Sequence, residues 1–143
     1  MKNIIDNLKK SFTNISKLIK YGNQNNLGSV NKNLKNKSGD LVKQLDLLSH
    51  NLIVENLKKC HNLGGYISEE SPNINFIEPK LYNISTMEDF DDEKYIVAFD
   101  PLDGSSNISS NITTGTIFGI YKYKDDEINE IVCAGYCLYG PAT

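Results

Sequence analysis

The chain has 143 residues, 39% of them hydrophobic, which is enough for one globular domain. Its formal net charge is −3, with a pI near 5.3, and this argues against general nucleic-acid binding. No run approaches the roughly 20 apolar residues of a transmembrane helix, and the N-terminus has no signal-peptide core.

The basic residues and the cysteines bear on how the chain could bind phosphate and on its cellular compartment. All 15 basic residues are lysines, so the bidentate phosphate clamp that arginine provides is missing. The three cysteines, Cys60, Cys133 and Cys137, form an odd number without a secretory leader, which predicts reduced thiols in a cytosolic protein. Cys133 and Cys137 lie in an apolar, strand-like run, where we expect them to be small core residues.

Two amphipathic helices are predicted in the first 60 residues. The first covers Asn3–Tyr21, and a polar, mobile loop is expected over about 22–38. The second covers Leu41–Cys60, with Asp40 as its N-cap. Asp46 lies beside the apolar stripe of this helix, where an aspartate is usually a solvated surface residue.

Short strands follow. Tyr66 and Ile67 begin one that leads to Glu69–Glu70, and 73–78 is another candidate. Adjacent glutamates at a strand end point in opposite directions, so one could face a metal and the other a water molecule. An exposed turn is the alternative interpretation of this pair. Residues 113–123 and 131–139 predict a β-hairpin, and the acidic run at 88–93 predicts a solvated loop.

The stretch from Tyr95 to Tyr121 contains the strongest signal for chemistry. An apolar run suited to a buried strand ends at Asp100, and Pro101 holds Asp100 extended. Asp103 follows, and Gly104 allows a sharp bend. Two carboxylates at the end of a buried strand are costly unless a cation lies between them, and Mg²⁺ is the natural candidate. The residues after Asp103 offer backbone N–H groups and hydroxyls, a ready anion site. Metal ligands beside a phosphate cradle suggest metal-assisted phosphoryl chemistry.

These motifs carry a family resemblance. DPLDGSSN at 100–107, TGTIFGIY at 114–121 and AGYCLYGPAT at 134–143 resemble the signature of class 1 fructose-1,6-bisphosphatases. The resemblance extends back through Ser68–Glu70 and 45–49 to Gly39 and Asp40, and it covers roughly 29–143. It implies the N-terminal half of a layered sugar-phosphatase fold, a mixed α/β unit with helices packed on a twisted, largely antiparallel sheet. The whole of 1–143 would be this N-terminal domain, with the C-terminal half absent.

The resemblance also implies roles for individual residues. Two or three Mg²⁺ ions, with Mn²⁺ or Zn²⁺ as alternatives, would be held by Glu69, Asp100, Asp103 and the Leu102 carbonyl, and Asp40 matches a position linked to a further metal. The pair that orients and deprotonates the attacking water would be Asp46 and Glu70. The 1-phosphate would be held by Asp103, Gly104, Ser105 and Ser106.

A second site in the family binds the inhibitor AMP. Its positions here are Lys94, Tyr95 and Lys122, where Lys122 replaces an arginine of the family. The family's loop around the AMP phosphate lies before the start of this chain, which also counts against AMP control. Ser109 replaces the aspartate usual after S-S-N-I.

The expected function is Mg²⁺-dependent hydrolysis of the 1-phosphate of fructose 1,6-bisphosphate, in gluconeogenesis and in the cytoplasm. The 6-phosphate and sugar contacts belong to the family's second half, so this chain alone is expected to be weak or inactive. The full chain would form a homo-oligomer, a tetramer in the family, without nucleic-acid or membrane partners. Two alternatives stay open: a non-catalytic chain that associates with a full-length phosphatase subunit, and a relative acting on sedoheptulose or inositol phosphates.

Overall fold

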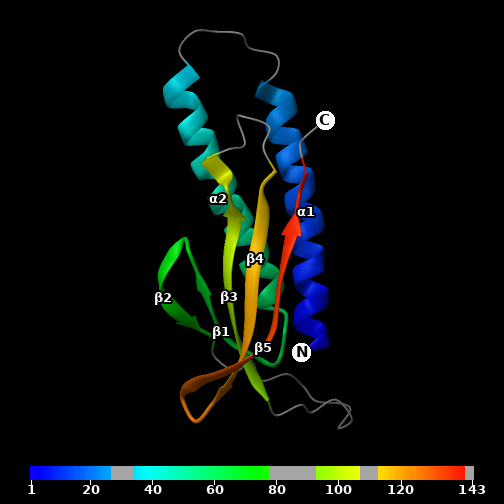
Figure 1. The fold of residues 1–143 in the computed structure, drawn as a ribbon, viewed down its shortest axis with the longest axis vertical. Helices are drawn as coiled ribbons and strands as arrows, with labels where there is room; N and C mark the ends of the chain where they lie inside the picture. Colours follow the sequence, from blue (N-terminus) through cyan, green and yellow to red (C-terminus); the bar gives the residue numbers. More distant parts are fainter. Residues whose placement is uncertain (27–33, 78–92, 107–112, 141–143) are drawn as a thin grey trace.

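The computed structural model describes residues 1–26, 34–77, 93–106 and 113–140; the side chains of 21–26, 34–41 and 72 are outside this description. It contains two helices and five strands in the described part (Figure 1). In chain order these are α1 (Lys2–Asn26), α2 (Leu34–Leu57), β1 (Leu63–Ser68), β2 (Ser71–Phe76), β3 (Lys94–Asp103), β4 (Gly115–Lys124) and β5 (Glu127–Leu138).

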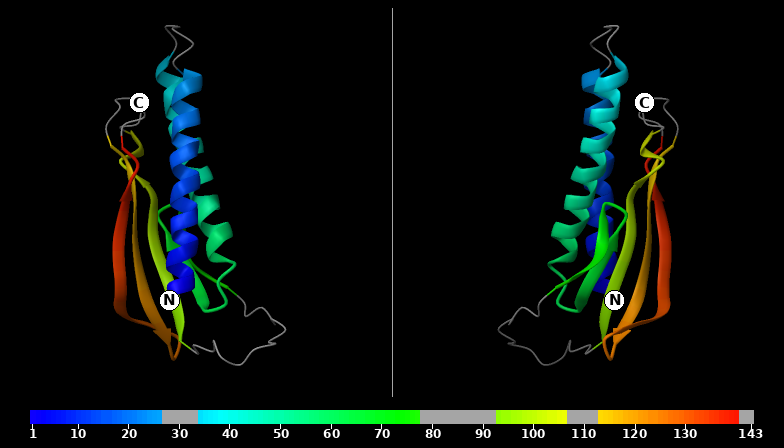
Figure 2. Two further views of the ribbon diagram at one scale, coloured as in Figure 1. Left: turned by 90° about the vertical axis from the view of Figure 1, so that its right-hand side faces the viewer. Right: turned by 90° about the vertical axis from the view of Figure 1, so that its left-hand side faces the viewer.

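The strands form one twisted sheet in the order β2-β1-β3-β4-β5. Strand β1 pairs with β3 in parallel, while the other three pairings are antiparallel. Figure 2 shows both helices packed on one face of the sheet, with the opposite face bare of described helix. The expected mixed α/β fold with a largely antiparallel sheet is therefore confirmed.

The core lies between the helices and the covered face of the sheet. The apolar stripe of α1 is buried, and its lysines face solvent, as the sequence periodicity predicts. Phe12 on α1 stacks on Phe118 of β4, with ring centroids 5.8 Å apart. Among the described residues, the largest fully buried side chains of this core are Ile4, Leu8, Ile15, Ile53, Leu57, Val97, Leu102 and Ile120.

The predicted loop over about 22–38 is wrong at both of its ends. Helix α1 continues to Asn26 and α2 already begins at Leu34, so only 27–33 of the expected loop lie outside the described residues. Asparagine and lysine suggested a loop, but the helical parts of this stretch, 22–26 and 34–38, have no proline and one glycine, Gly22, which costs a helix only about 1 kcal/mol. The same early start places Asp40 inside α2, so its predicted role as N-cap is also wrong.

The β4–β5 hairpin is confirmed, with its turn at Asp125 and Asp126. Both residues have positive φ, 54° and 61°. This is the backbone of a type I′ turn, whose twist matches that of the flanking strands. Aspartate tolerates the left-handed region better than most residues do.

The face of the sheet turned away from the helices carries apolar side chains. Ile117 on β4 lies directly opposite Tyr136 on β5, and these side chains are 48% and 71% exposed. Leu138 and Ile131 on β5 are also exposed, as is Phe76 on β2. Cys133 and Cys137 are half-buried rather than enclosed in the core. Within the described residues, no helix is both long and apolar enough to cross a membrane.

The packing of α2 predicts a sharp difference between two of its aliphatic residues. Ile53 is fully buried, so Ile53→Ala should lower the free energy of unfolding by about 2–5 kcal/mol. Leu47 on the same helix is 54% exposed, and Leu47→Ala should change it by about 0.5 kcal/mol at most. Urea unfolding followed by circular dichroism measures both. Equal losses in the two variants would contradict the described orientation of α2.

Candidate active site

The parallel pairing of β1 with β3 brings two acidic segments to one edge of the sheet. Ser68 at the end of β1 is level with Phe99 on β3, and the Glu69 N–H donates to the Phe99 carbonyl at 3.2 Å. Carboxyl ends of parallel strands meet at the same edge. Glu69 therefore lies beside Asp100, although 30 residues separate them in the chain.

Asp100 is the most constrained carboxylate of this edge. Its Oδ1 accepts a hydrogen bond from the Leu102 N–H at 3.0 Å, which orients the carboxylate across the Asp-Pro-Leu turn. The pKa of Asp100 is raised to about 6, mainly by burial; a hydrogen bond with Glu69 and the charges of Glu69 and Asp103 contribute to the rise, and the Leu102 N–H opposes it. Asp100 is therefore protonated more easily than an ordinary aspartate when no cation is bound.

Helix α2 adds a carboxylate from the side. Asp46 forms a side-chain hydrogen bond with Ser105, just past the end of β3. Burial is the main reason that the pKa of Asp46 rises to about 6; the charges of Glu70 and Asp100 add to the rise, and Ser105 opposes it. Asp46 is therefore half-buried near Glu70 and Asp100, and together with Glu69 and Asp103 these residues form an acidic cluster; the alternative on sequence grounds was a fully solvated helix residue.

The last residues of β3 are held by contacts from β4 and from the chain beyond β5. The Thr116 hydroxyl donates to the Pro101 carbonyl at 2.8 Å, and it also shares a short hydrogen bond with the Tyr139 hydroxyl. Burial raises the pKa of Tyr139 well above its usual range, so its hydroxyl stays protonated. Gly104 has a φ of 74°, a conformation that favours glycine and that turns the chain toward Ser105.

Three supporting residues escaped the sequence reasoning. Two of them are Thr116 and Tyr139, whose hydroxyl groups are hydrogen-bonded to each other. The third is His50 on α2, which is hydrogen-bonded to Ser68, the residue immediately before the glutamate pair. Their roles depend on partners at least 15 residues away in the chain, and no local pattern reports such contacts. The only available signal was the scarcity of histidine, of which the chain has 2.

Comparison with known proteins identifies this arrangement. The family model described as fructose-1-6-bisphosphatase, N-terminal domain, matches residues 1–143. The chain belongs to the fructose-1,6-bisphosphatase family.

Individual relatives agree. The chain is 44% identical over 118 residues to fructose-1,6-bisphosphatase 1 of Mus musculus, covering 76% of this chain and 32% of the mouse protein. It is 41% identical over 115 residues to the cytosolic enzyme of Spinacia oleracea, covering 73% of this chain and 31% of the spinach protein. It thus spans about a third of the length of these relatives.

Solved structures show the same fold. Leishmania major fructose-1,6-bisphosphatase in its holo form superposes with a TM-score of 0.70, at 24% sequence identity, over 96% of this chain and 39% of that one. Its T-state structure gives a TM-score of 0.67 over 97% of this chain and 42% of that one.

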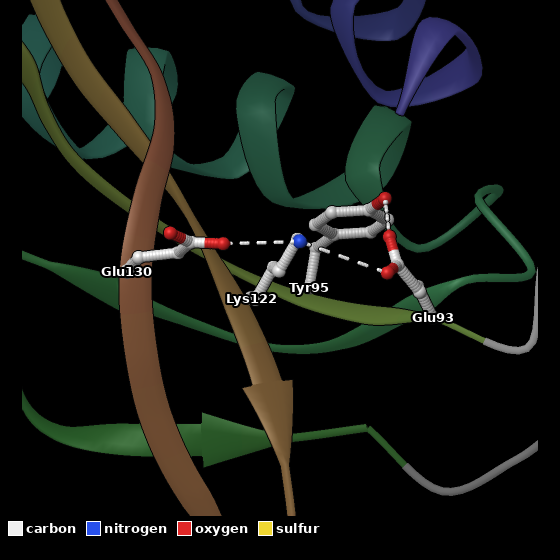
Figure 3. Close-up of polar contacts among 4 residues, drawn as sticks. All are labelled: Glu93, Tyr95, Lys122 and Glu130. Carbon is white, nitrogen blue, oxygen red and sulfur yellow. Dashed lines mark hydrogen bonds and ion pairs between the residues drawn. The ribbon is translucent and has the colours of Figure 1, made fainter.

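The positions that the family resemblance links to AMP lie at the opposite end of β3. Lys94 and Tyr95 begin this strand, and Lys122 is level with Tyr95 on β4. Figure 3 shows Lys122 between two carboxylates, with its Nζ 3.0 Å from Glu130 and 3.7 Å from Glu93. The Tyr95 hydroxyl donates to the same Glu93 at 2.8 Å. Two acidic neighbours around this lysine disfavour an incoming phosphate.

Other predicted site residues are placed unevenly. Asp40 is on α2 six residues before Asp46, about 9 Å farther along the helix axis, and its side chain is outside the description.

Two surface cavities, of about 380 and 530 Å³, lie away from the acidic residues: one near Lys122 and the turn after β4, the other between α1 and the end of β5.

The donor set at the corner of the sheet where β1 and β3 end suits a hard cation. Carboxylate oxygens and a nearby backbone carbonyl are the ligands that Mg²⁺ prefers, and a cation would relieve the repulsion that raises the pKa of Asp100. Among the described residues, however, no three His, Cys, Asp or Glu side chains already converge on one point. The residues therefore fit a divalent ion in kind, with the exposed Glu69 and Asp103 side chains free to adjust on binding.

The raised pKa of Asp46 predicts how stability depends on pH in the metal-free chain. Its folded pKa of about 6 exceeds the ordinary 3.8, so the folded state holds the proton more tightly. The free energy of unfolding should therefore decline as the pH rises from about 4 to about 6 and then level off. Asp46→Asn should remove part of this decline, about 1 kcal/mol, because solvent screens a partly exposed group.

Urea unfolding in chelator across this pH range measures the effect. Asp6→Asn, at an exposed position on α1, is the matched control and should keep the wild-type slope. A slope that Asp46→Asn leaves unchanged would contradict the described burial of Asp46 within the acidic cluster.

Proposed function

We propose that this chain supplies the metal and phosphate end of a phosphatase site that hydrolyses the 1-phosphate of fructose 1,6-bisphosphate to fructose 6-phosphate. One observation carries the proposal: carboxylates from α2, from the residues after β1 and from the end of β3 lie near enough for their charges to raise the pKa of Asp46 and Asp100, in a domain of the fructose-1,6-bisphosphatase family. A bound cation would relieve the repulsion between these carboxylates and would neutralise a phosphate beside them.

The residues divide into three groups: those that would hold the metal ions, those that bind the phosphate, and the pair that handles the proton of the attacking water. Mg²⁺, or Mn²⁺ or Zn²⁺ in its place, would be held by Glu69, Asp100, Asp103 and the carbonyl of Leu102, with Asp40 toward a further ion. Bound divalent cations stabilise the negative charge that builds on a phosphate during displacement.

The chain's own groups bind the phosphate and manage the proton. Gly104, Ser105 and Ser106 offer N–H and hydroxyl donors to the phosphate oxygens. Asp46 and Glu70 orient the attacking water and accept its proton. A general base is most effective when its pKa is close to the working pH, and the pKa of Asp46 is raised to about 6. Asp46 therefore suits this role better than an ordinary aspartate does.

The wider setting rests on the relatives. The spinach relative is named cytosolic, and we place this chain in the cytoplasm and in gluconeogenesis by analogy. The remaining length of the relatives would add the sugar and 6-phosphate contacts, and with them the choice between fructose, sedoheptulose and inositol phosphates. We therefore expect these 143 residues to be weak or inactive by themselves, and the longer enzyme to be a homo-oligomer.

A second candidate function follows from the apolar side chains exposed on the bare face of the sheet, notably Tyr136 and Leu138. A contiguous apolar patch on a soluble chain marks an interaction surface. The chain could then act without catalysis by associating with a full-length phosphatase subunit. Co-purification with such a subunit, reduced by Tyr136→Lys, would favour this candidate; a monomer that ignores the subunit would exclude it.

The phosphatase proposal is tested by binding and by turnover. Calorimetry should show that fructose 1,6-bisphosphate binds the chain only in the presence of Mg²⁺, and phosphate release, where measurable, should stop in chelator. Asp103→Asn should weaken Mg²⁺-dependent binding by about 10-fold or more and remove any turnover, since it deletes a charged ligand. Asp6→Asn is the control and should behave as wild type.

Two results would contradict parts of this proposal. Binding of the bisphosphate that needs no Mg²⁺ and ignores Asp103→Asn would exclude the metal-assisted site. Robust turnover by the isolated chain with micromolar substrate affinity would refute the claim that it is weak on its own.

A further inference from the structure

His50 connects helix α2 to both strand ends of the acidic corner. Its Nδ1 lies 2.8 Å from the Ser68 Oγ, at the last residue of β1. Its ring packs against Phe99, the residue before Asp100, with centroids 5.9 Å apart, and meets Tyr66 edge-on at 6.1 Å. One side chain thus contacts the residues that immediately precede Glu69 and Asp100.

Ser68 connects His50 to the glutamate pair through a second hydrogen bond, made to Glu70. Its side chain is only 3% exposed, and its Oγ accepts a hydrogen bond from the Glu70 N–H at 3.3 Å. The Glu69 N–H, by contrast, bonds to the Phe99 carbonyl and not to Ser68. The two glutamates of the turn are therefore anchored separately, Glu69 by the sheet and Glu70 by the Ser68 hydroxyl.

The imidazole has the protonation state that this arrangement needs. Burial is the main cause that lowers the pKa of His50, with Lys58 adding to it and Glu70 opposing it, so the ring is neutral at pH 7. A neutral ring with its proton on Nε2 presents Nδ1 as an acceptor. The Ser68 hydroxyl can then donate to Nδ1 while it accepts from Glu70, and each of its bonds has one donor and one acceptor.

We propose that His50 is a positioning residue for Glu70: it fixes the Ser68 hydroxyl, and Ser68 fixes the backbone of the Glu69–Glu70 turn against the end of β3. The consequence for activity rests on the proposed function, in which Glu70 handles the proton of the attacking water. The coupling itself rests only on the contacts of His50 and Ser68. Hydrogen-bonded supports of this kind commonly matter because they hold a functional group in its productive geometry.

Two substitutions separate the hydrogen bond of His50 from its packing. His50→Phe keeps a ring against Tyr66 and Phe99 but has no acceptor for Ser68. His50→Asn loses the ring but places Oδ1 on Cγ, where histidine carries Nδ1. Should His50→Phe fail to fold, His50→Leu serves in its place, because it keeps an apolar side chain beside Tyr66 and Phe99 and has no hydrogen-bonding atom.

Amide hydrogen exchange, followed residue by residue by NMR, is the structural readout. His50→Phe should speed exchange at the Glu70 N–H roughly fivefold, the effect of losing one modest hydrogen bond, while His50→Asn stays near wild type. The Glu69 N–H is the internal control and should hold its rate in every variant. Unchanged exchange at Glu70 in His50→Phe, or equal changes in His50→Phe and His50→Asn, would overturn the proposal.

A second readout distinguishes this proposal from the phosphatase function. Mg²⁺-dependent binding of fructose 1,6-bisphosphate, measured by calorimetry, should weaken in His50→Phe and recover in His50→Asn. If Glu70 responds as expected but no variant, nor the wild type, binds the bisphosphate with Mg²⁺, then the positioning role stands and the proposed function fails. Binding that weakens while Glu70 exchange stays at the wild-type rate would overturn the positioning role.

Discussion

The parallel pairing of β1 with β3 is the constraint on which this structure depends. It is the one parallel pairing in the described sheet, and just beyond its last residue pair the Glu69 N–H donates a hydrogen bond to the Phe99 carbonyl. Because both strands end at the same edge, residues from distant parts of the chain face one another there. An antiparallel arrangement would send Glu69 and Asp100 to opposite ends of the sheet, and the acidic corner would not exist.

The burial and mutual repulsion of the carboxylates at this corner lower the stability of the metal-free fold when they are ionised. Burial and mutual repulsion raise the pKa of both Asp46 and Asp100 to about 6, so the metal-free fold favours protons where the unfolded chain would not. The neutral contacts around the corner oppose this cost, through the Thr116 bond to Pro101 and the His50 bond to Ser68. Groups that are held against their own electrostatics are a common sign of a functional site, since a bound ligand relieves the strain.

Local patterns predicted much of this arrangement, and non-local pairings account for the rest. The stripe of α1, the hairpin and the sharp bend at Gly104 follow from periodicity and turn chemistry, and the structure confirms them; the apolar pattern of α2 holds only in part, since Leu48 is 47% exposed while Ser49 is buried. The motif around Asp100 predicted which side chains to examine, while their roles stay predictions. The parallel register could not be foreseen because β2 and residues 78–92 intervene, and the His50 contact spans 18 residues. Polar composition predicted the wrong helix ends, because tertiary packing outweighs weak helix propensities.

Paramagnetic relaxation by Mn²⁺ tests the central claim most directly. In a titration of the ¹⁵N-labelled chain, the amides of Glu69, Asp100 and Ser105 should broaden together and first, because one ion at the joined ends of β1 and β3 lies close to all three. Lys94 and Lys122, at the far end of the same strands, should broaden only at much higher Mn²⁺. Broadening that starts at other acidic sites, such as the Asp125–Asp126 turn, or that separates Glu69 from Asp100, would contradict the account.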